Sequence, residues 1–116
     1  MKLKSPITTH VLDTSAGQPA NGIEVILYCQ KQDGTWIQLA SKLTDSDGRI
    51  ADFLTSEGIT TGRYRLVFST EAYFKSRGTA AFYPEVTIDF VVTTESENYH
   101  VPLLLSPYGY TTYRGS

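Results

Sequence analysis

The sequence has 116 residues, of which 41% are hydrophobic and 19% charged, a balance typical of a folded globular protein rather than a disordered chain. Ten basic and twelve acidic residues give a net charge of −2, which argues against the basic excess of a nucleic-acid-binding protein. We therefore expect a single domain spanning residues 1–116, large enough for one packed core.

Cysteine content and hydropathy indicate in which cellular compartment the protein is expected. Cys29 is the sole cysteine, so an intrachain disulfide is excluded and a reducing compartment is compatible. The basic start of the chain is not followed by an apolar run of signal-peptide length, and no window reaches the roughly 18 apolar residues of a membrane span. We expect a cytoplasmic protein that has neither a membrane nor a nucleic acid as its partner.

Apolar and polar residues alternate in short runs separated by turn residues, a pattern typical of β-strands. The turn at 31–34, with its Asp-Gly pair, predicts a hairpin between the second and third runs. Eight strands are expected in chain order: Ile7–Asp13, 23–30, 36–43, 50–54, Arg63–Ser69, Val86–Val92, Tyr99–Leu105 and Tyr108–Arg114.

One segment, Thr70–Gly78, breaks the alternation and predicts a helix of about two turns. Thr70 is the expected N-cap, Glu71 lies in the first turn, and Gly78 is the expected stop. Strands with one apolar face must bury it against another sheet, so the fold class is an all-β sandwich with one short helix.

The strand Tyr99–Leu105 is apolar on both faces, because Pro102 and Leu104 share the second face with His100. Such strands are usually covered on both sides, and in a chain with so little helix the natural cover is another subunit. Pro102 lacks an amide donor, so we expect a sheet edge or a bulge near it.

Two histidines, His10 and His100, are the candidates for acid–base chemistry. On its own pattern a strand histidine such as His10 is more often structural, whereas His100 shares a face with apolar residues that would help to keep it neutral. Two imidazoles can divide the roles of base and donor if they converge, which sequence does not show across ninety positions.

The other candidate sites give weaker signals. Asp45–Gly48 resembles part of a calcium loop but lacks its downstream carboxylates, and the ordinary interpretation of Arg49 is an exposed residue after a hairpin turn. Cys29 alternates with core residues and is expected to pack there. There is no Gly-rich phosphate loop and no Gly-x-Ser-x-Gly elbow.

Several stretches together resemble one family. They are Thr9–Asp13 with Gly17–Ala20, Thr44–Arg49, Phe82–Val86, His100–Pro107 and the terminal tetrapeptide Tyr113–Ser116. In this order and over essentially the whole chain, they are similar to the transthyretin-related proteins that act as 5-hydroxyisourate hydrolases. Asn98 departs from the family, whose members often have histidine at that position.

The resemblance implies a transthyretin-like β-sandwich of two four-stranded sheets with one short helix, assembled as a homotetramer (a dimer of dimers). It implies hydrolysis of the small molecule 5-hydroxyisourate without a cofactor or metal. It also implies a set of site residues: His10, Arg49, His100 and Ser116 as catalytic, and Arg49, Tyr113, Arg114 and Gly115 as substrate-binding.

Two non-enzymatic alternatives remain open from the residues alone. A sandwich of this kind could carry a hydrophobic hormone-like ligand in a channel between subunits, or serve as a structural interaction domain. A carrier requires an apolar channel, whereas His10, Arg49, His100 and Arg114 would make it cationic and rich in hydrogen-bonding groups.

Overall fold

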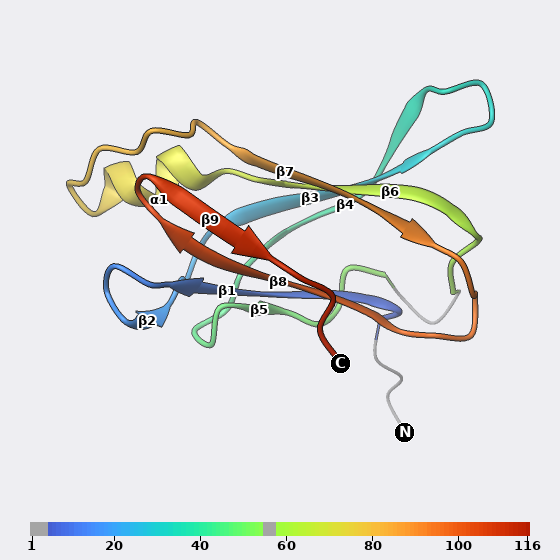
Figure 1. Cartoon of the computed structure of the whole chain (residues 1–116), viewed down its shortest axis with the longest axis horizontal. Helices are drawn as coiled ribbons and strands as arrows, with labels where there is room; N and C mark the ends of the chain where they lie inside the picture. The colour runs from blue at the N-terminus through green and yellow to red at the C-terminus, as the bar shows by residue number, and fades with distance from the viewer. Residues whose placement is uncertain (1–4, 55–57) are drawn as a thin grey trace.

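The computed structural model describes residues 5–54 and 58–116. The described residues form nine strands and one helix: β1 Ile7–Asp13, β2 Gln18–Pro19, β3 Glu24–Gln30, β4 Trp36–Leu43, β5 Arg49–Ile50, β6 Gly62–Phe68, α1 Thr70–Ser76, β7 Val86–Val92, β8 Tyr99–Ser106 and β9 Gly109–Thr112. Figure 1 shows two layers, one with the order β4–β3–β6–β7 and the other with the order β2–β1–β8–β9. The strand β5 also pairs with β1, so the second sheet has five strands. The predicted all-β sandwich is therefore confirmed.

The pairing of β1 with β8 is parallel, and every other ladder is antiparallel. It runs in register from Ile7 opposite Tyr99 to Asp13 opposite Leu105. Two segments about ninety positions apart in the sequence thus lie side by side at the centre of the sheet.

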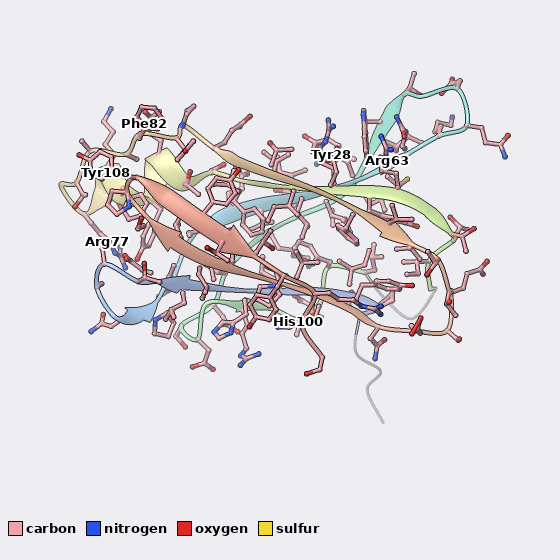
Figure 2. All side chains as sticks on the ribbon, viewed as in Figure 1. Tyr28, Arg63, Arg77, Phe82, His100 and Tyr108 are labelled. Carbon is pink, nitrogen blue, oxygen red and sulfur yellow. The ribbon has the colours of Figure 1, made fainter. Side chains whose placement is uncertain are left out.

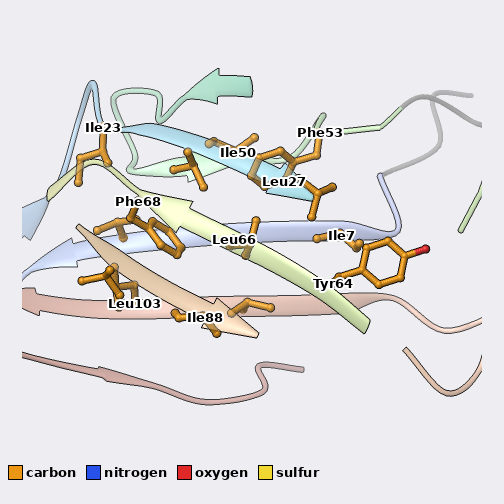
Figure 3. Packing of buried hydrophobic residues seen from close by; sticks show 14 of the residues in the cluster. Ile7, Ile23, Leu27, Ile50, Phe53, Tyr64, Leu66, Phe68, Ile88 and Leu103 are labelled. Carbon is orange, nitrogen blue, oxygen red and sulfur yellow. The ribbon is translucent and has the colours of Figure 1, made fainter. Parts of the chain in front are cut away.

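The core lies between the two layers because each strand turns its apolar alternate residues inward. Figure 3 shows Leu27 and Phe68 of one sheet packed towards Ile7 and Leu103 of the other. Cys29 packs at the margin of this cluster, as its alternation predicted.

The strand boundaries differ from prediction where the ladders are short. The strand expected at 50–54 is reduced to Arg49–Ile50, and β2 was not predicted. Two-residue strands carry no periodicity, so alternation cannot reveal them. The sheet containing β1 therefore has five strands where the prediction gave four.

The helix lies where it was expected, but its first residue differs. Ser69 is the N-cap, and its side chain makes no capping hydrogen bond. Thr70 is already helical, and its hydroxyl donates to the carbonyl of Tyr83 instead. Gly78 ends the segment with a φ of +71°, as predicted. The described residues contain no helix with the length and apolar character needed to cross a membrane.

The strand β8 lies inside the sheet, but its regular ladder with β9 ends at Leu103, so Pro102 lies at a local gap in the sheet, as expected for a residue without an amide donor. The carbonyls of His100 and Pro102 accept hydrogen bonds from Gly115 and Thr112, on the side of β8 that faces the chain terminus. The missing N–H of Pro102 faces the same way. The regular strand β9 ends at Thr112, so the proline stands beyond the regular ladder.

The buried carboxylate of Asp13, at the end of β1, connects the sheet to α1. Its Oδ2 accepts a 2.8 Å hydrogen bond from the Tyr73 hydroxyl, and its Oδ1 accepts backbone bonds from Ser15 and Ala16. Burial alone would raise the pKa of the Asp13 carboxyl, but the hydrogen bonds outweigh burial and lower it. Burial, together with the bond to Asp13, raises the pKa of Tyr73 to about 12, so the hydroxyl remains a donor.

We expect Tyr73→Phe to lower the free energy of unfolding by about 1–3 kcal/mol at pH 7, because a buried carboxylate oxygen loses its donor. The lowered pKa of Asp13 means that ionisation of this residue stabilises the fold above its unfolded pKa of about 3.9. That contribution is lost as the pH falls through the lower folded value. Urea unfolding should therefore show a larger penalty at pH 7 than at pH 3. Tyr108→Phe, at a residue 72% exposed, is the control, and an equal loss in both variants would contradict the assignment.

Candidate active site

A cavity of about 520 Å³ opens beside the N-terminal ends of β1 and β8. Its lining includes Thr8 of β1, Arg49 of β5, His100 of β8 and Ser116 at the chain terminus. Three of the predicted catalytic residues, from three separate parts of the chain, thus converge here. Asn98, two positions before His100 and immediately ahead of β8, also lines the cavity.

His100 is held at its ring on one side and at its backbone on the other. Its Nδ1 lies 2.8 Å from the Thr8 hydroxyl, across the parallel ladder. On the other side, the Gly115 N–H donates to the His100 carbonyl at 2.8 Å. Figure 2 shows His100 beside the segment that follows β9. Contacts of this kind fix the orientation of a ring that has to exchange protons.

Gly115 packs so closely on this ring that a larger residue would not fit. A Cβ added at Gly115 would lie 2.6 Å from Cδ2 of His100 and 3.1 Å from Cγ of Pro102. The absence of a side chain at Gly115 therefore leaves the space that the His100 ring occupies.

His10, the fourth predicted catalytic residue, is not among the residues that line the cavity; it lies two residues along β1 from Thr8, on the same strand face. In the β1–β5 ladder, His10 pairs with Arg49. The pKa of the His10 imidazole is lowered, first by partial burial and then by the positive charge of the Arg49 guanidinium. A hydrogen bond that the His10 ring donates to the Asp47 backbone carbonyl, together with the carboxylates of Asp45 and Asp47, opposes the shift without cancelling it. The lowered pKa favours the neutral form of His10 at pH 7.

The turn that precedes Arg49 is built by hydrogen bonding within the chain. The Asp45 carboxylate accepts backbone bonds from Asp47 and Arg49. Gly48 has a φ of +74°, and a Cβ there would overlap the carbonyl oxygen of Val11. The run that resembles a calcium loop thus positions Arg49 against β1. Within residues 5–54 and 58–116, no group of three or more His, Cys, Asp or Glu side chains could hold a metal ion.

The terminal tetrapeptide divides between two surfaces. Ser116 lines the cavity with Arg49, whereas Tyr113 and Arg114 line a second cavity of about 380 Å³, between β7 and the end of β9. His100 lies between the two cavities and lines both. The structure therefore does not bring Arg114 to Arg49. Successive residues of an extended chain point to opposite faces, and Arg114 points away from the face of His100 and Gly115.

Sequence reasoning missed Thr8 as a functional residue. It shares a strand face with His10, and that alternation was the available signal. Its contact with His100 depends on the parallel partner of β1, which no local pattern reveals.

Comparison with known proteins shows which family this chain belongs to. The HIUase/Transthyretin family matches residues 7–115. The chain belongs to this family. The 5-hydroxyisourate hydrolase of Mus musculus is 49% identical over 117 residues, which cover 97% of this chain and 96% of that protein. Among solved structures, the 5-hydroxyisourate hydrolase of Klebsiella pneumoniae is similar with a TM-score of 0.83 and 37% identity, covering 95% of this chain and 97% of that one. Sea bream transthyretin in complex with thyroxine is similar with a TM-score of 0.90 and 32% identity, covering 95% and 94%.

Within the HIUase/Transthyretin family, sequence identity favours the enzymes. Among the solved structures the chain is 37% identical to the Klebsiella hydrolase and 32% identical to sea bream transthyretin, and by sequence it is 49% identical to the mouse hydrolase. The protein is an enzyme of this family, and the resemblance carried by the sequence motifs is confirmed.

We expect Gly115→Ala to displace the His100 ring, because the new methyl group would lie within 3 Å of it. The ring C–H resonances of His100 in an NMR spectrum report the displacement. Gly109→Ala is the matched control on β9, since the atom nearest to its Cβ would be the Ser106 hydroxyl oxygen at 3.8 Å. Unchanged His100 resonances in Gly115→Ala would contradict the packing.

Proposed function

We propose that the protein hydrolyses 5-hydroxyisourate, the product of urate oxidation, to 2-oxo-4-hydroxy-4-carboxy-5-ureidoimidazoline. The observation that carries the proposal is the convergence of Arg49, His100 and Ser116 on one cavity. The names and identities of the mouse and Klebsiella relatives support the choice of substrate.

The cavity offers groups suited to opening a cyclic amide. In the proposed reaction, the neutral imidazole of His100 takes a proton from water as the water oxygen attacks a ring carbonyl. The guanidinium of Arg49, a permanent cation with several donors, stabilises the oxyanion that develops. The carbon–nitrogen bond then breaks, the nitrogen takes the proton that His100 received from water, and the carboxylic acid formed at the attacked carbon loses its proton to solvent. A positioned base typically contributes about 10²–10⁴ in rate.

His10 and Ser116 have supporting roles in this proposal. In the neutral form that its lowered pKa favours, His10 adds no positive charge beside Arg49 and remains able to take part in proton exchange. Ser116, which lines the cavity, orients water or substrate. The proposed chemistry proceeds with these side chains and no cofactor.

We further propose a cytoplasmic homotetramer, a dimer of dimers, in which the face that carries the site lies against another subunit. Leu12 and Leu104 pair in register on this face and are both half-buried in the isolated chain. An apolar pair beside a polar cavity favours burial against a partner that also shields the site from solvent.

The carrier alternative fits the cavity less well. Arg49, His100 and Ser116 present charge and hydrogen-bonding groups where a hydrophobic ligand requires apolar surface. The similarity to sea bream transthyretin therefore supports the fold and not this ligand class.

Generating 5-hydroxyisourate in situ with urate oxidase and following its ultraviolet decay tests the proposal. We expect the wild-type protein to accelerate the decay and His100→Asn to abolish the acceleration with the fold intact by circular dichroism. Arg77→Gln, at the far end of the molecule, is the control with full activity (Figure 2). Sedimentation equilibrium of the same wild-type sample checks the tetramer. Decay at the spontaneous rate with wild-type protein would overturn the assignment.

The ring of His10 should titrate below its usual pKa of 6.5, so its neutral form should persist into mildly acidic solution. Burial is the larger cause of the shift and the Arg49 guanidinium the second, so Arg49→Gln should move the midpoint upwards. NMR titration of the His10 ring protons measures both values. Arg63→Gln, on the other sheet, should leave the midpoint unchanged. A wild-type midpoint above 6.5 would contradict this account.

A further inference from the structure

Arg114 contacts the protein on the side of the sheet opposite the cavity. Its guanidinium carbon lies 4.5 Å from the centroid of the Tyr99 ring, and its Nη2 donates to the Asn98 carbonyl at 3.3 Å. Glu97 adds an ion pair at 3.8 Å between half-exposed side chains, which contributes little. The arginine next to Gly115 is thus bound to the segment that leads into β8.

The Tyr99 ring is a rigid platform for this contact. It is 4% exposed, and its hydroxyl accepts hydrogen bonds from the backbone N–H groups of Thr93 and Thr94. The same hydroxyl donates to the Thr94 carbonyl. Because the ring cannot move freely, a cation held over it fixes the chain that carries the cation.

The chain terminus needs such a contact because the backbone ladder is interrupted there. The register that pairs Leu103 with Thr112 and His100 with Gly115 puts Pro102 opposite Tyr113. Pro102 has no N–H to donate across this gap. The next backbone bond, from Gly115 to the His100 carbonyl, therefore lies three residues beyond the end of β9.

We propose that Arg114 is a positioning residue, which holds Gly115 against His100 and Ser116 at the cavity while itself remaining on the opposite face. The proposal rests on the function proposed above for the role of Ser116. It assigns the two arginines different tasks: Arg49 contacts the substrate, and Arg114 contacts Tyr99 and Asn98.

This role differs from direct contact with the substrate in what its loss changes. A cation bound to the substrate contributes to affinity, so its removal raises KM. A residue that holds the terminal segment in place sets the fraction of molecules with Ser116 at the cavity, so its removal lowers kcat. It also changes the mobility of Gly115 and Ser116 in the absence of any substrate.

The experiment compares Arg114→Gln with Arg114→Lys in the full-length protein. We expect Arg114→Gln to lower kcat about three- to tenfold, the effect of losing a cation–π contact and a hydrogen bond at an exposed site, with KM unchanged. In the same variant, the ¹⁵N heteronuclear NOE of Gly115 and Ser116 should fall towards values typical of a mobile terminus. Arg114→Lys keeps a cation over the Tyr99 ring and should restore most of both signals.

Arg77→Gln is the matched control, because the Arg77 guanidinium carbon lies 4.2 Å from the centroid of the Tyr73 ring at the other end of the molecule. It should change neither kcat nor the NOE of the terminal residues. A rise in KM, or a fall in kcat with the terminal residues still ordered, would overturn the positioning role. So would an ordered terminus with unchanged kinetics in Arg114→Gln. If wild-type protein has no activity, the proposed function fails, and the NOE comparison still tests the inference.

Discussion

The parallel pairing of β1 with β8 is the constraint on which the site depends. It puts Thr8 opposite His100 and His10 opposite Pro102, so both histidines lie on one face of neighbouring strands. The Thr9 hydroxyl, buried on the other face, donates to the Val101 carbonyl at 2.6 Å and helps to fix this register. A slip of one residue would turn His10 into the core and bring Val11 to the surface, at the cost of the apolar burial that holds the sheets together.

Arg49 reaches the site by a different route, through a turn rather than a long strand. The Asp45 carboxylate accepts hydrogen bonds from the backbone N–H groups of Asp47 and Arg49 and so holds the turn together. Gly48 lets the turn approach the Val11 carbonyl more closely than a residue with a side chain could. The approach places the guanidinium near enough to lower the pKa of His10. Turn geometry and imidazole protonation are thus linked through one glycine.

Much of the fold could be predicted from alternation, because each long strand has one buried face. Val86–Val92 has the predicted boundaries, and the 31–34 turn joins β3 and β4 as expected. Alternation could not give the parallel partner of β1, since a strand's own pattern says which face is buried and not which strand lies beside it. For the same reason the contact between Thr8 and His100 was missed.

The terminal tetrapeptide shows how a local rule can be overlooked. Tyr108–Arg114 was predicted as a strand, and alternation along an extended chain already puts Arg114 and Gly115 on opposite faces. Treating the four residues as one binding motif hides this division. The structure separates them into Ser116 at one cavity and Arg114 at another.

The same sandwich occurs in sea bream transthyretin, crystallised with thyroxine, and in the Klebsiella hydrolase. Both sheets direct their apolar residues inward, so the core specifies the fold and leaves the outer face of β1 and β8 free to vary. On that face, this chain carries Thr8, His10 and His100, with Arg49 beside them. Polar residues on this outer face do not reduce the apolar packing of the core. Each lies in a fixed register, because the buried neighbours that alternate with it hold the strands in place. A stable interior therefore supplies the precision that a hydrolytic site requires on its surface.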